Sequence, residues 1–375
     1  MREVNSTYLP FFALIIVFAV LISLAACQGI ANGNLTAHFL DVGQGDSILI
    51  QCHNKSVLID SGEQDMGPRV SSYLQNHGIK EINLLVATHP HSDHIGGLSA
   101  ILNNFKVDQV LDSGQAHPSP IYESFLTLID QKNIPYKVAE REQTIDIDPS
   151  IKIEVLSPPP NAYFQDLNAG SIVLKVVYNK IVFLLMSDAV TEAENNIMAS
   201  GYDLKSDILK VGHHGSATST GTIFLNKVLP SISVIEVGEG NDYGHPKPET
   251  LKKLQEIGSK IYRTDLYGNI EVTTDGETFS VTTQKTDNTN RSVAPYAKPI
   301  RSSSSAVAPA GSSSSHITEP VSSQRVFVGS TKSNKYHYLT CSSAKAIKSE
   351  NKIWFSSSED ARAKGYVPCG KCHPP

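Results

Sequence analysis

Residues 82–97 read INLLVATHPHSDHIGG, an apolar run that leads directly into a cluster of metal-binding side chains. The run 82–87 is short and carries no charge, which predicts a buried strand. Three imidazoles and one carboxylate follow within six residues, just before a helical pattern that begins at Leu98. Neutral imidazole and carboxylate are the usual ligands of a catalytic divalent metal. The stretch therefore predicts a metal site at the end of a buried strand, with a solvated polar loop as the alternative.

Similar chemical groups recur at the ends of other apolar runs. We expect strands at 35–42, 46–51, 57–62, 171–178, 181–186, 207–211 and 231–237. Several of these strands end in, or are followed by, groups that could bind metal or substrate, namely Asp60, Asp188, His213, His214 and His245. Two series of strands and helices that end in such loops predict a two-sheet α/β sandwich, with helices outside and the site at one rim.

The chain has the composition of an ordinary globular protein, with 375 residues, 40% apolar and 18% charged residues, and a formal net charge of −5. It is long enough for one large domain and an appendage. Residues 285–325 are rich in serine, proline and alanine, so they cannot bury a core and predict a linker. We therefore expect a body at 35–284 and a small unit at 326–375. Basic residues outnumber acidic ones in the small unit, which suggests an anionic partner.

The N-terminus carries a targeting segment that is not part of the fold. Residues 8–26 are apolar throughout and end in Leu24-Ala25-Ala26-Cys27. Small residues before a cysteine resemble a bacterial-type lipoprotein signal, which predicts that residues 1–27 are a signal and that Cys27 is lipidated. The alternative is an uncleaved transmembrane anchor, because this segment can nearly span a bilayer. Both interpretations predict an exported body held at the cell surface.

The motif His-x-His-x-Asp-His at 89–94 resembles the signature of the metallo-β-lactamase superfamily, and Asp60, Asp188 and the pair His213–His214 occur in the family's order. The resemblance implies an αββα sandwich. Seven sequence blocks look most like the hydrolase domain of the DNA-uptake competence channel proteins, over residues 35–283. These blocks are FLDVGQGDSILIQ, LIDSG, THPHSDHIGG, LSPPP, SDA, LKVGHHGS and YGHPKPETL.

This resemblance implies two divalent metal ions, zinc or manganese, and the hydrolysis of a phosphorus or carbonyl centre. The implied metal ligands are His89, His91, Asp93, His94, Asp188 and His213. His89 and His91 would belong to the first site and Asp93, His94 and a late histidine to the second. Asp188 would bridge the two ions, and Asp60 would orient the ligands.

Asp93, His214 and His245 are the residues expected to act in catalysis. Because His213 and His214 are adjacent, only one is expected to point into a given site. We assign the ligand to His213, with His214 facing substrate or donating a proton. His245 could contact a substrate phosphate or act as a general acid, and a plain turn histidine is its alternative. Lys210 is expected to be an ordinary strand residue.

One ligand of the family pattern is missing. The superfamily usually supplies a third histidine between the first motif and the bridging carboxylate. Here that interval contains only His117, close to its start, while Asn168 and Ser171 stand near the expected place. A first site without this imidazole would be weaker, richer in water, or suited to a harder ion such as manganese.

A second predicted metal site lies at the end of the chain. His337-x-x-x-Cys341 and Cys369-x-x-Cys372 have the ligand pattern of a closed tetrahedral zinc site. A unit of about fifty residues has a small core, so a bound metal would add needed stability. The pattern resembles the metal-binding module of the Ada-type DNA-repair proteins, which commonly uses four cysteines. Because a histidine replaces one of them here, we expect a structural zinc; a disulfide with one free thiol is the alternative.

These features predict an exported, lipid-anchored metallohydrolase that cuts DNA or another nucleic acid, in DNA uptake or in the degradation of external DNA. A hydrolase of a small molecule such as a lactam, thioester or phosphoester is one alternative. A surface protein that binds nucleic acid through a degenerate metal centre is another. In the small unit, four aromatic residues could stack bases or form the core: Tyr336, Tyr338, Trp354 and Phe355.

Overall fold

The computed structural model describes residues 33–162, 164–286, 327–338, 341–348, 351–355, 361–362 and 364–371. The chain separates into two compact units, Met1–Arg301 and Ser302–Pro375. The predicted signal with Cys27, almost all of the predicted linker, and Cys372 lie outside the described residues, so what we predict for them stays a prediction. Within the described ranges, no helix is both long and apolar enough to cross a bilayer.

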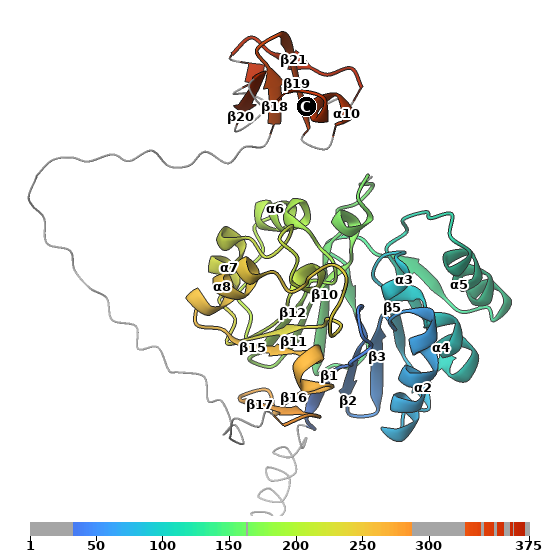
Figure 1. Cartoon of the computed structure of the whole chain (residues 1–375). Coiled ribbons are helices and arrows are strands. Elements are labelled where there is room, and N and C mark those ends of the chain that lie inside the picture. Colours follow the sequence, from blue (N-terminus) through green and yellow to red (C-terminus); the bar gives the residue numbers. More distant parts are fainter. Residues whose placement is uncertain are drawn as a thin grey trace, which may run out of the picture. The chain divides into compact units, whose positions relative to one another are not determined.

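The first sheet of the larger unit contains the strand that precedes the histidine motif (Figure 1). Its strands are β1 (Leu35–Phe39), β2 (Ile48–Cys52), β3 (Lys55–Ile59), β5 (Leu84–Ala87), β7 (Val110–Asp112), β8 (Tyr136–Val138), β16 (Ile270–Thr274) and β17 (Phe279–Thr283). They lie in the order β17-β16-β1-β2-β3-β5-β7-β8, and the last four are parallel. Parallel strands end at the same edge of a sheet, so Asp60 after β3 and Thr88 after β5 are neighbours.

The second sheet repeats this arrangement with the later part of the body. Its strands are β9 (Thr144–Ile145), β10 (Ile151–Ser157), β11 (Val173–Tyr178), β12 (Ile181–Leu185), β13 (Ile208–Lys210), β14 (Ile232–Ile235) and β15 (Lys260–Arg263). Their order is β15-β14-β13-β12-β11-β10-β9, with β12 to β15 parallel. The loops after β12 and β13 carry Asp188 and the pair His213–His214, which therefore meet at one rim.

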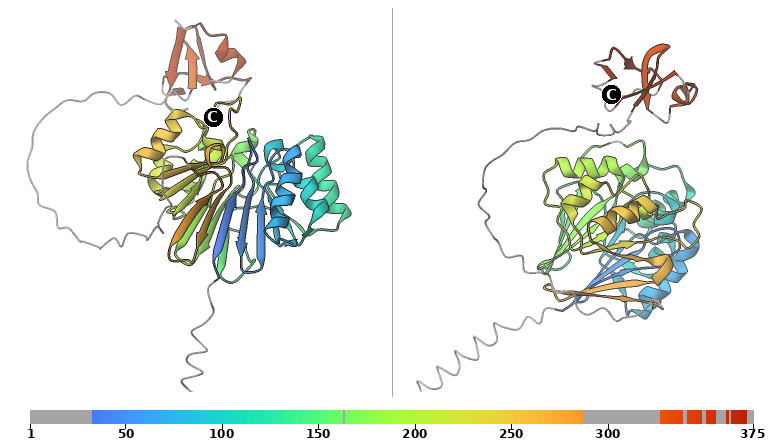
Figure 2. Two further views of the ribbon diagram at one scale, coloured as in Figure 1. Left: turned by 60° about the horizontal axis from the view of Figure 1, so that its bottom comes forward. Right: turned by 60° about the vertical axis from the view of Figure 1, so that its left-hand side comes forward.

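The two sheets face each other, and helices cover their outer faces (Figures 1 and 2). The first sheet packs against α2 (Gly67–Asn76), α3 (Ser92–Ile95), α4 (Leu98–Asn104) and α5 (Pro120–Gln131). The second packs against α6 (Thr191–Ala199), α7 (Thr222–Val228) and α8 (Pro248–Glu256). Apolar side chains from both sheets, among them Phe39, Ile50, Val176 and Phe183, fill the space between them. This confirms the predicted αββα sandwich.

A glycine turn before β2 fixes the histidine motif against the rest of the rim. Gly45 has φ +135°, and a Cβ added to it would lie 2.1 Å from the carbonyl oxygen of Asp93. The backbone N–H of Asp46 donates a 3.2 Å hydrogen bond to that same oxygen. Only glycine permits this conformation and this close approach. The turn thereby holds Asp93 and brings Asp46 beneath it.

The predicted element boundaries agree with the structure to within about two residues at most of their ends. The run 46–51, for example, was expected to be a strand from its first residue, but β2 begins at Ile48. Asp46 and Ser47 instead belong to the rim, where both are buried. A hairpin at Asp275-Gly276 joins β16 to β17. The body also contains β4 (Glu81–Ile82), β6 (Lys106–Val107) and α9 (Thr264–Tyr267).

The small unit is built on a sheet of four short strands. These are β18 (Phe327–Ser330), β19 (Ser333–Tyr338), β20 (Lys352–Phe355) and β21 (Val367–Pro368), in the order β20-β18-β19-β21, and α10 (Ser342–Lys345) accompanies them. Tyr336 and Phe355 are buried at 0% and 1% exposure beside Phe327 and Ala361. These two aromatic rings form the core and are not available for base stacking. The side chains of Tyr338 and Trp354 lie outside the described part.

Candidate metal centre

His94 is held in one orientation by a buried carboxylate. Asp60, which directly follows β3, accepts hydrogen bonds from the backbone N–H of Thr88 (2.9 Å), the Thr88 hydroxyl (2.6 Å) and His94 Nδ1 (2.8 Å). Since Nδ1 of His94 donates to this carboxylate, Nε2 is the ring nitrogen that faces the rim. This is the geometry that the predicted orienting role of Asp60 requires.

His214 is oriented in the same manner by a backbone carbonyl. Its Nδ1 donates to the carbonyl oxygen of Glu236 at 2.9 Å, because a carbonyl can only accept. Its Nε2 consequently points at two carboxylates, 3.4 Å from Asp93 Oδ2 and 3.4 Å from Asp188 Oδ1. Ligand atoms of Asp93, His94, Asp188 and His214 all lie within 4.8 Å of one another.

Three atoms of this cluster are buried without a hydrogen-bond partner: His94 Nε2, His214 Nε2 and Asp188 Oδ1. Leaving a buried polar atom unpaired costs about 1–3 kcal/mol. Three such atoms converge from three different loops, and one cation bound among them would satisfy all three. Two imidazole nitrogens and two carboxylates are also the donor set of a divalent metal site. The residues at this position fit a metal ion.

A second pair of imidazoles lies next to this cluster, with the His89 ring centroid 4.2 Å from that of His94. His89 Nε2 is 2.9 Å from His91 Nδ1 and 4.0 Å from Asp188 Oδ2. Asp188 therefore approaches residues of both groups, as the predicted bridging role requires. Hereafter the cluster of Asp93, His94 and His214 is called position two, and the pair His89–His91 is called position one.

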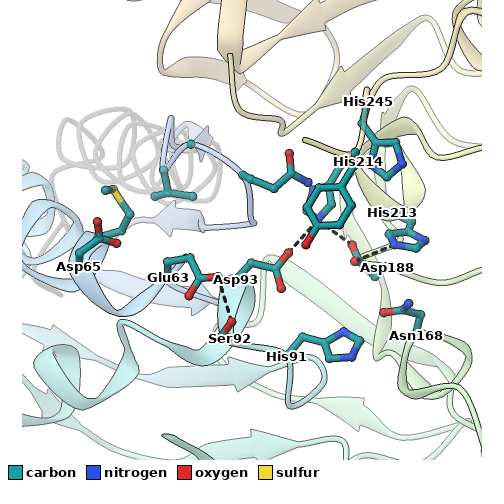
Figure 3. Close-up of a pocket in the computed structure, with 15 residues that line it drawn as sticks. Glu63, Asp65, His91, Ser92, Asp93, Asn168, Asp188, His213, His214 and His245 are labelled. Atoms are coloured by element: carbon teal, nitrogen blue, oxygen red, sulfur yellow. Dashed lines mark hydrogen bonds and ion pairs between the residues drawn. The ribbon is translucent and has the colours of Figure 1, made fainter. Parts of the chain in front are cut away.

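Position one has an amide where the family pattern has an imidazole. Asn168, on the short 3-10 helix Leu167–Gly170, lines the cavity beside His91 and Asp188 (Figure 3). Its Oδ1 is buried without a hydrogen-bond partner. Ser171 is fully buried with an unpartnered hydroxyl, and His117 is not among the residues that line the cavity. An amide oxygen available as a ligand beside position one favours a harder ion than an imidazole would.

The structure changes the roles expected for His213 and His214. Both adopt left-handed backbone conformations, with φ of 49° and 52°. In such helical geometry successive side chains diverge by about 100° and do not point to opposite faces as in a strand. Both rings therefore approach Asp188, with His213 Nε2 3.7 Å from Oδ2. His214 is the ring inside the four-residue cluster and His213 stands at the cavity wall, so the geometry favours the reverse of our assignment.

Charges within the cluster oppose the effect of burial on several pKa values. Burial alone would lower the pKa of His94, but the carboxylates of Asp188, Asp93 and Asp60 raise it well above its ordinary value. Burial would raise the pKa of Asp188, but His214 and His94 hold it well below. Burial and the neighbouring His94 lower the pKa of His89, which is therefore a neutral ring. The carboxylates of this cluster thus favour positive charge beside them, which a bound cation would supply.

Sequence reasoning missed a buried charged layer behind the metal ligands. Lys210, the last residue of β13, is fully buried, forms an ion pair with Asp46 and donates to the carbonyl oxygen of Ser187 at 3.0 Å. Asp46 Oδ1 in turn lies 3.4 Å from His214 Nδ1. Glu236, also fully buried, accepts from the backbone N–H of Ser47 at 3.0 Å. The available signal was a charge inside an apolar strand, because a buried charge requires a partner.

The metal ligands open into a cavity of about 580 Å³ at the rim between the two sheets. Figure 3 shows its wall, with His245 on one side and Glu63 and Asp65 on the other. Burial, followed by the charges of His213 and His214, lowers the pKa of His245 to about 4. This ring is therefore neutral near pH 7. It suits a hydrogen bond to substrate better than the general-acid role among our expectations.

In the small unit, His337, Cys341 and Cys369 come together as predicted. All three are buried, and their ligand atoms lie within 4.8 Å of one another. The two cysteines pack with Val328 and Ala344 in a small cluster of their own. Cys372, the fourth predicted ligand, lies outside the described residues. One imidazole and two thiolates in an apolar setting fit a structural zinc ion.

Comparison with known proteins adds to this geometry. A family model described as the metallo-beta-lactamase superfamily matches residues 40–235, and the metal binding domain of Ada matches residues 318–375. The ComE operon protein 3 of Bacillus subtilis is 31% identical over 62% of this chain and 32% of its own length. Competence protein ComA of Neisseria gonorrhoeae is 31% identical over 62% of this chain and 31% of its own length.

A shorter similarity is to ribonuclease Z of Alkaliphilus oremlandii, 31% identical over 24% of this chain and 29% of that protein. The chain thus spans about a third of the length of the relatives it matches. The resemblances to the superfamily, to competence proteins and to the Ada module are confirmed. The first family model covers more than half of the 375 residues and includes the histidine motif, the bridging carboxylate and the His213–His214 pair. The chain belongs to the metallo-beta-lactamase superfamily.

Proposed function

We propose that this protein is an exported, metal-dependent hydrolase that cuts the phosphodiester bonds of nucleic acid, with DNA outside the cell as its substrate. The observation that carries the hydrolase is the convergence of three buried, unpartnered atoms, His94 Nε2, His214 Nε2 and Asp188 Oδ1. Lipidation of Cys27 would hold the body at the cell surface. DNA uptake and the degradation of external DNA are both compatible with this activity.

In this proposal Asp93, His94, His214 and Asp188 hold one metal ion, and His89, His91 and Asp188 hold another with Asn168 beside them. The chemistry that divalent ions supply when bound in such a site is Lewis-acid polarisation of the phosphoryl group and activation of a water molecule. Asp60 and the carbonyl of Glu236 keep the lone pairs of His94 and His214 aimed at the site. His245 offers a neutral imidazole to a phosphate oxygen or a sugar hydroxyl.

The choice of nucleic acid as substrate rests on the relatives. One is named a competence protein, another the ComE operon protein 3, and a third a ribonuclease. Because the chain spans only about a third of each, their complete activities are not transferred to it. The first two share about 62% of this chain, and the ribonuclease shares 24% of it. Among the hydrolytic reactions that we expect of this fold, phosphodiester hydrolysis is the one that agrees with proteins of these names.

The small unit supports the same substrate class. A surface cavity of about 540 Å³ on this unit is lined by Lys332, Lys335 and Lys348, with the predicted zinc ligand His337 in its wall. No acidic side chain is among the described residues that line it. Lysines grouped in this way bind phosphate groups without regard to sequence. We propose that this groove holds the backbone of the nucleic acid.

A direct experiment is to strip the protein of metal, resupply zinc or manganese, and incubate it with linear single-stranded and double-stranded DNA. Cutting that requires the metal and is lost in Asp93→Ala is the expected result. The exposed Asp130→Ala, on α5, serves as the matched control and should cut like the unchanged protein. Absence of cutting with either metal would reject the nuclease.

One observation favours a second candidate, hydrolysis of a small molecule. Among the described residues that line the metal cavity, Glu63 and Asp65 contribute negative charge, whereas lysine and arginine are absent. A surface that binds a long polyanion is usually basic. If DNA is not cut, a panel of lactams, thioesters and small phosphoesters is the next test, and activity on one of them would establish this alternative.

A further inference from the structure

Tyr243 lies at the metal cavity and is exposed to solvent over 64% of its surface. Single exposed apolar residues are normal on protein surfaces, so exposure alone indicates nothing. Three further features distinguish this one: the ring beneath it, the loop that holds it, and the charges of the cavity that it borders.

The ring of Tyr243 rests on a second ring that leads to the metal ligands. Tyr243 stacks on His245 with centroids 5.7 Å apart and planes 22° apart. His245 meets His213 edge to face at 5.7 Å, and His213 Nε2 lies 3.7 Å from Asp188 Oδ2. Two imidazoles thus separate the tyrosine from the bridging carboxylate. The two rings are offset at this distance, and the 64% exposure of Tyr243 leaves ring surface open for another flat group.

The loop that carries Tyr243 is held by a set of hydrogen bonds. Asn241 Nδ2 donates to the carbonyl oxygens of Gly238 (2.9 Å) and His245 (2.7 Å), and its Oδ1 accepts from the His245 N–H at 3.0 Å. Lys247 Nζ donates to the Tyr243 carbonyl at 2.7 Å, and the Lys247 N–H donates to Gly215. An exposed aromatic ring on such a braced loop is already oriented before a ligand arrives, which lowers the entropy cost of binding.

The charges of the cavity do not attract a phosphate group, so a nucleotide would need another source of binding energy, which an aromatic ring can supply. Lysine and arginine are absent from the described residues that line the cavity, and Glu63 and Asp65 repel phosphate from the side opposite His245. A nucleotide held here would therefore gain little from salt bridges to the protein. Stacking of a base on an aromatic ring contributes about 1–3 kcal/mol and does not depend on the base.

From these three features we propose that Tyr243 stacks an unpaired base next to the scissile phosphate, which makes single-stranded nucleic acid the substrate. The inference rests on the proposed nuclease function and specifies its substrate. A base can lie flat on an aromatic ring only after it leaves its own pair and stack, and this costs least in a single strand or at a frayed end. A cavity of about 580 Å³ also has the size of a site for one small ligand, as a single nucleotide is.

The test uses a metal-loaded protein and a single-stranded oligonucleotide whose cut position has been mapped. An abasic nucleotide replaces the one on either side of the cut bond, one at a time. The unchanged protein should lose about tenfold to a hundredfold in kcat/KM at one of these two positions. Tyr243→Leu should cut the intact strand with a similar loss and should no longer distinguish the abasic strand. Tyr243→Phe, which keeps the ring, should behave like the unchanged protein.

A second readout does not require cutting. In the Asp93→Ala protein, a strand with 2-aminopurine at the identified position should lose fluorescence on binding, because stacking quenches this base. The quenching should vanish when Tyr243→Leu is added. Ile223→Ala removes another exposed apolar side chain, 71% exposed and not among the cavity residues, and should change neither result.

The outcomes separate this inference from the proposed function. If the unchanged protein cuts DNA but Tyr243→Leu still distinguishes the abasic strand, stacking on Tyr243 is wrong and the nuclease stands. Equal kcat/KM on single and double strands would also overturn the inference. If the unchanged protein cuts no strand with zinc or manganese, the nuclease itself fails and this inference fails with it.

Discussion

The two metal positions share one bridging carboxylate, yet they are built differently. Position two is closed by Asp93, His94 and His214, and the two imidazoles are each oriented by a buried hydrogen bond through Nδ1. Position one has the pair His89–His91 and, in place of a third imidazole, the amide of Asn168. One metal centre thus combines a preorganised position, whose ligands are already oriented, with a more adaptable one. We expect position two to bind metal first and position one to select the ion.

The largest effect is expected from Asp188→Ala, because this carboxylate belongs to both positions. Loss of a residue that only orients a metal ligand lowers activity roughly 10–100-fold, and Asp188→Ala should lower it by more. The amount of bound metal should fall at both positions. Metal content measured after dialysis, together with cutting rates, tests this. A variant that kept two tightly bound ions would contradict the shared bridge. The exposed Asp130→Ala is the matched control.

Lys210→Met should destabilise the protein by about 3–5 kcal/mol, since it leaves the buried carboxylate of Asp46 with only the longer contacts to His94 and His214. Denaturant unfolding of the metal-free protein measures this. Lys205→Met, at an exposed position just before the same strand, should leave stability nearly unchanged. A loss below about 1 kcal/mol for Lys210→Met would show that Asp46 does not depend on the lysine.

Asp60→Ala should increase the difference in metal affinity between the two positions. The substitution releases His94 of position two, whereas the Asp60 side chain does not contact His89 or His91 directly. Metal affinity at position two should fall about 10–100-fold, while position one changes less. Calorimetric titration with zinc resolves the two binding events. An equal loss at both positions would mean that Asp60 supports the rim as a whole and not one ligand.

Asn168→His should reduce the difference between the positions by restoring the imidazole of the family pattern. Zinc affinity at position one should rise by about tenfold, and the preference for manganese over zinc should weaken. Competition between the two ions, followed by metal analysis, measures the change. Asn195→His, on the exposed side of α6, adds a histidine elsewhere and should have no effect. Unchanged selectivity would remove Asn168 from position one.

Most of the fold could be predicted because its signals are local. Apolar runs of strand length and the short segments between them placed both sheets, and the strand before the histidine motif is buried at all four positions, as expected. The motif itself is also local, since His89, His91, Asp93 and His94 lie on one loop. Asp60 and Asp188 could be named because each follows a strand that ends at the same rim.

What the sequence by itself determined is therefore the αββα body, the ligands carried by strand-end loops, and the histidine and cysteine spacing of the small unit. The tertiary structure decided which of two adjacent histidines enters position two, because that depends on two left-handed φ angles. It also brought Asp46, Lys210 and Glu236 together from three strands or their ends, and it left Tyr243 exposed at the cavity. Such contacts join residues as far apart as Ser47 and Glu236, which are 189 positions apart, and the spacing of residues along the chain does not indicate them.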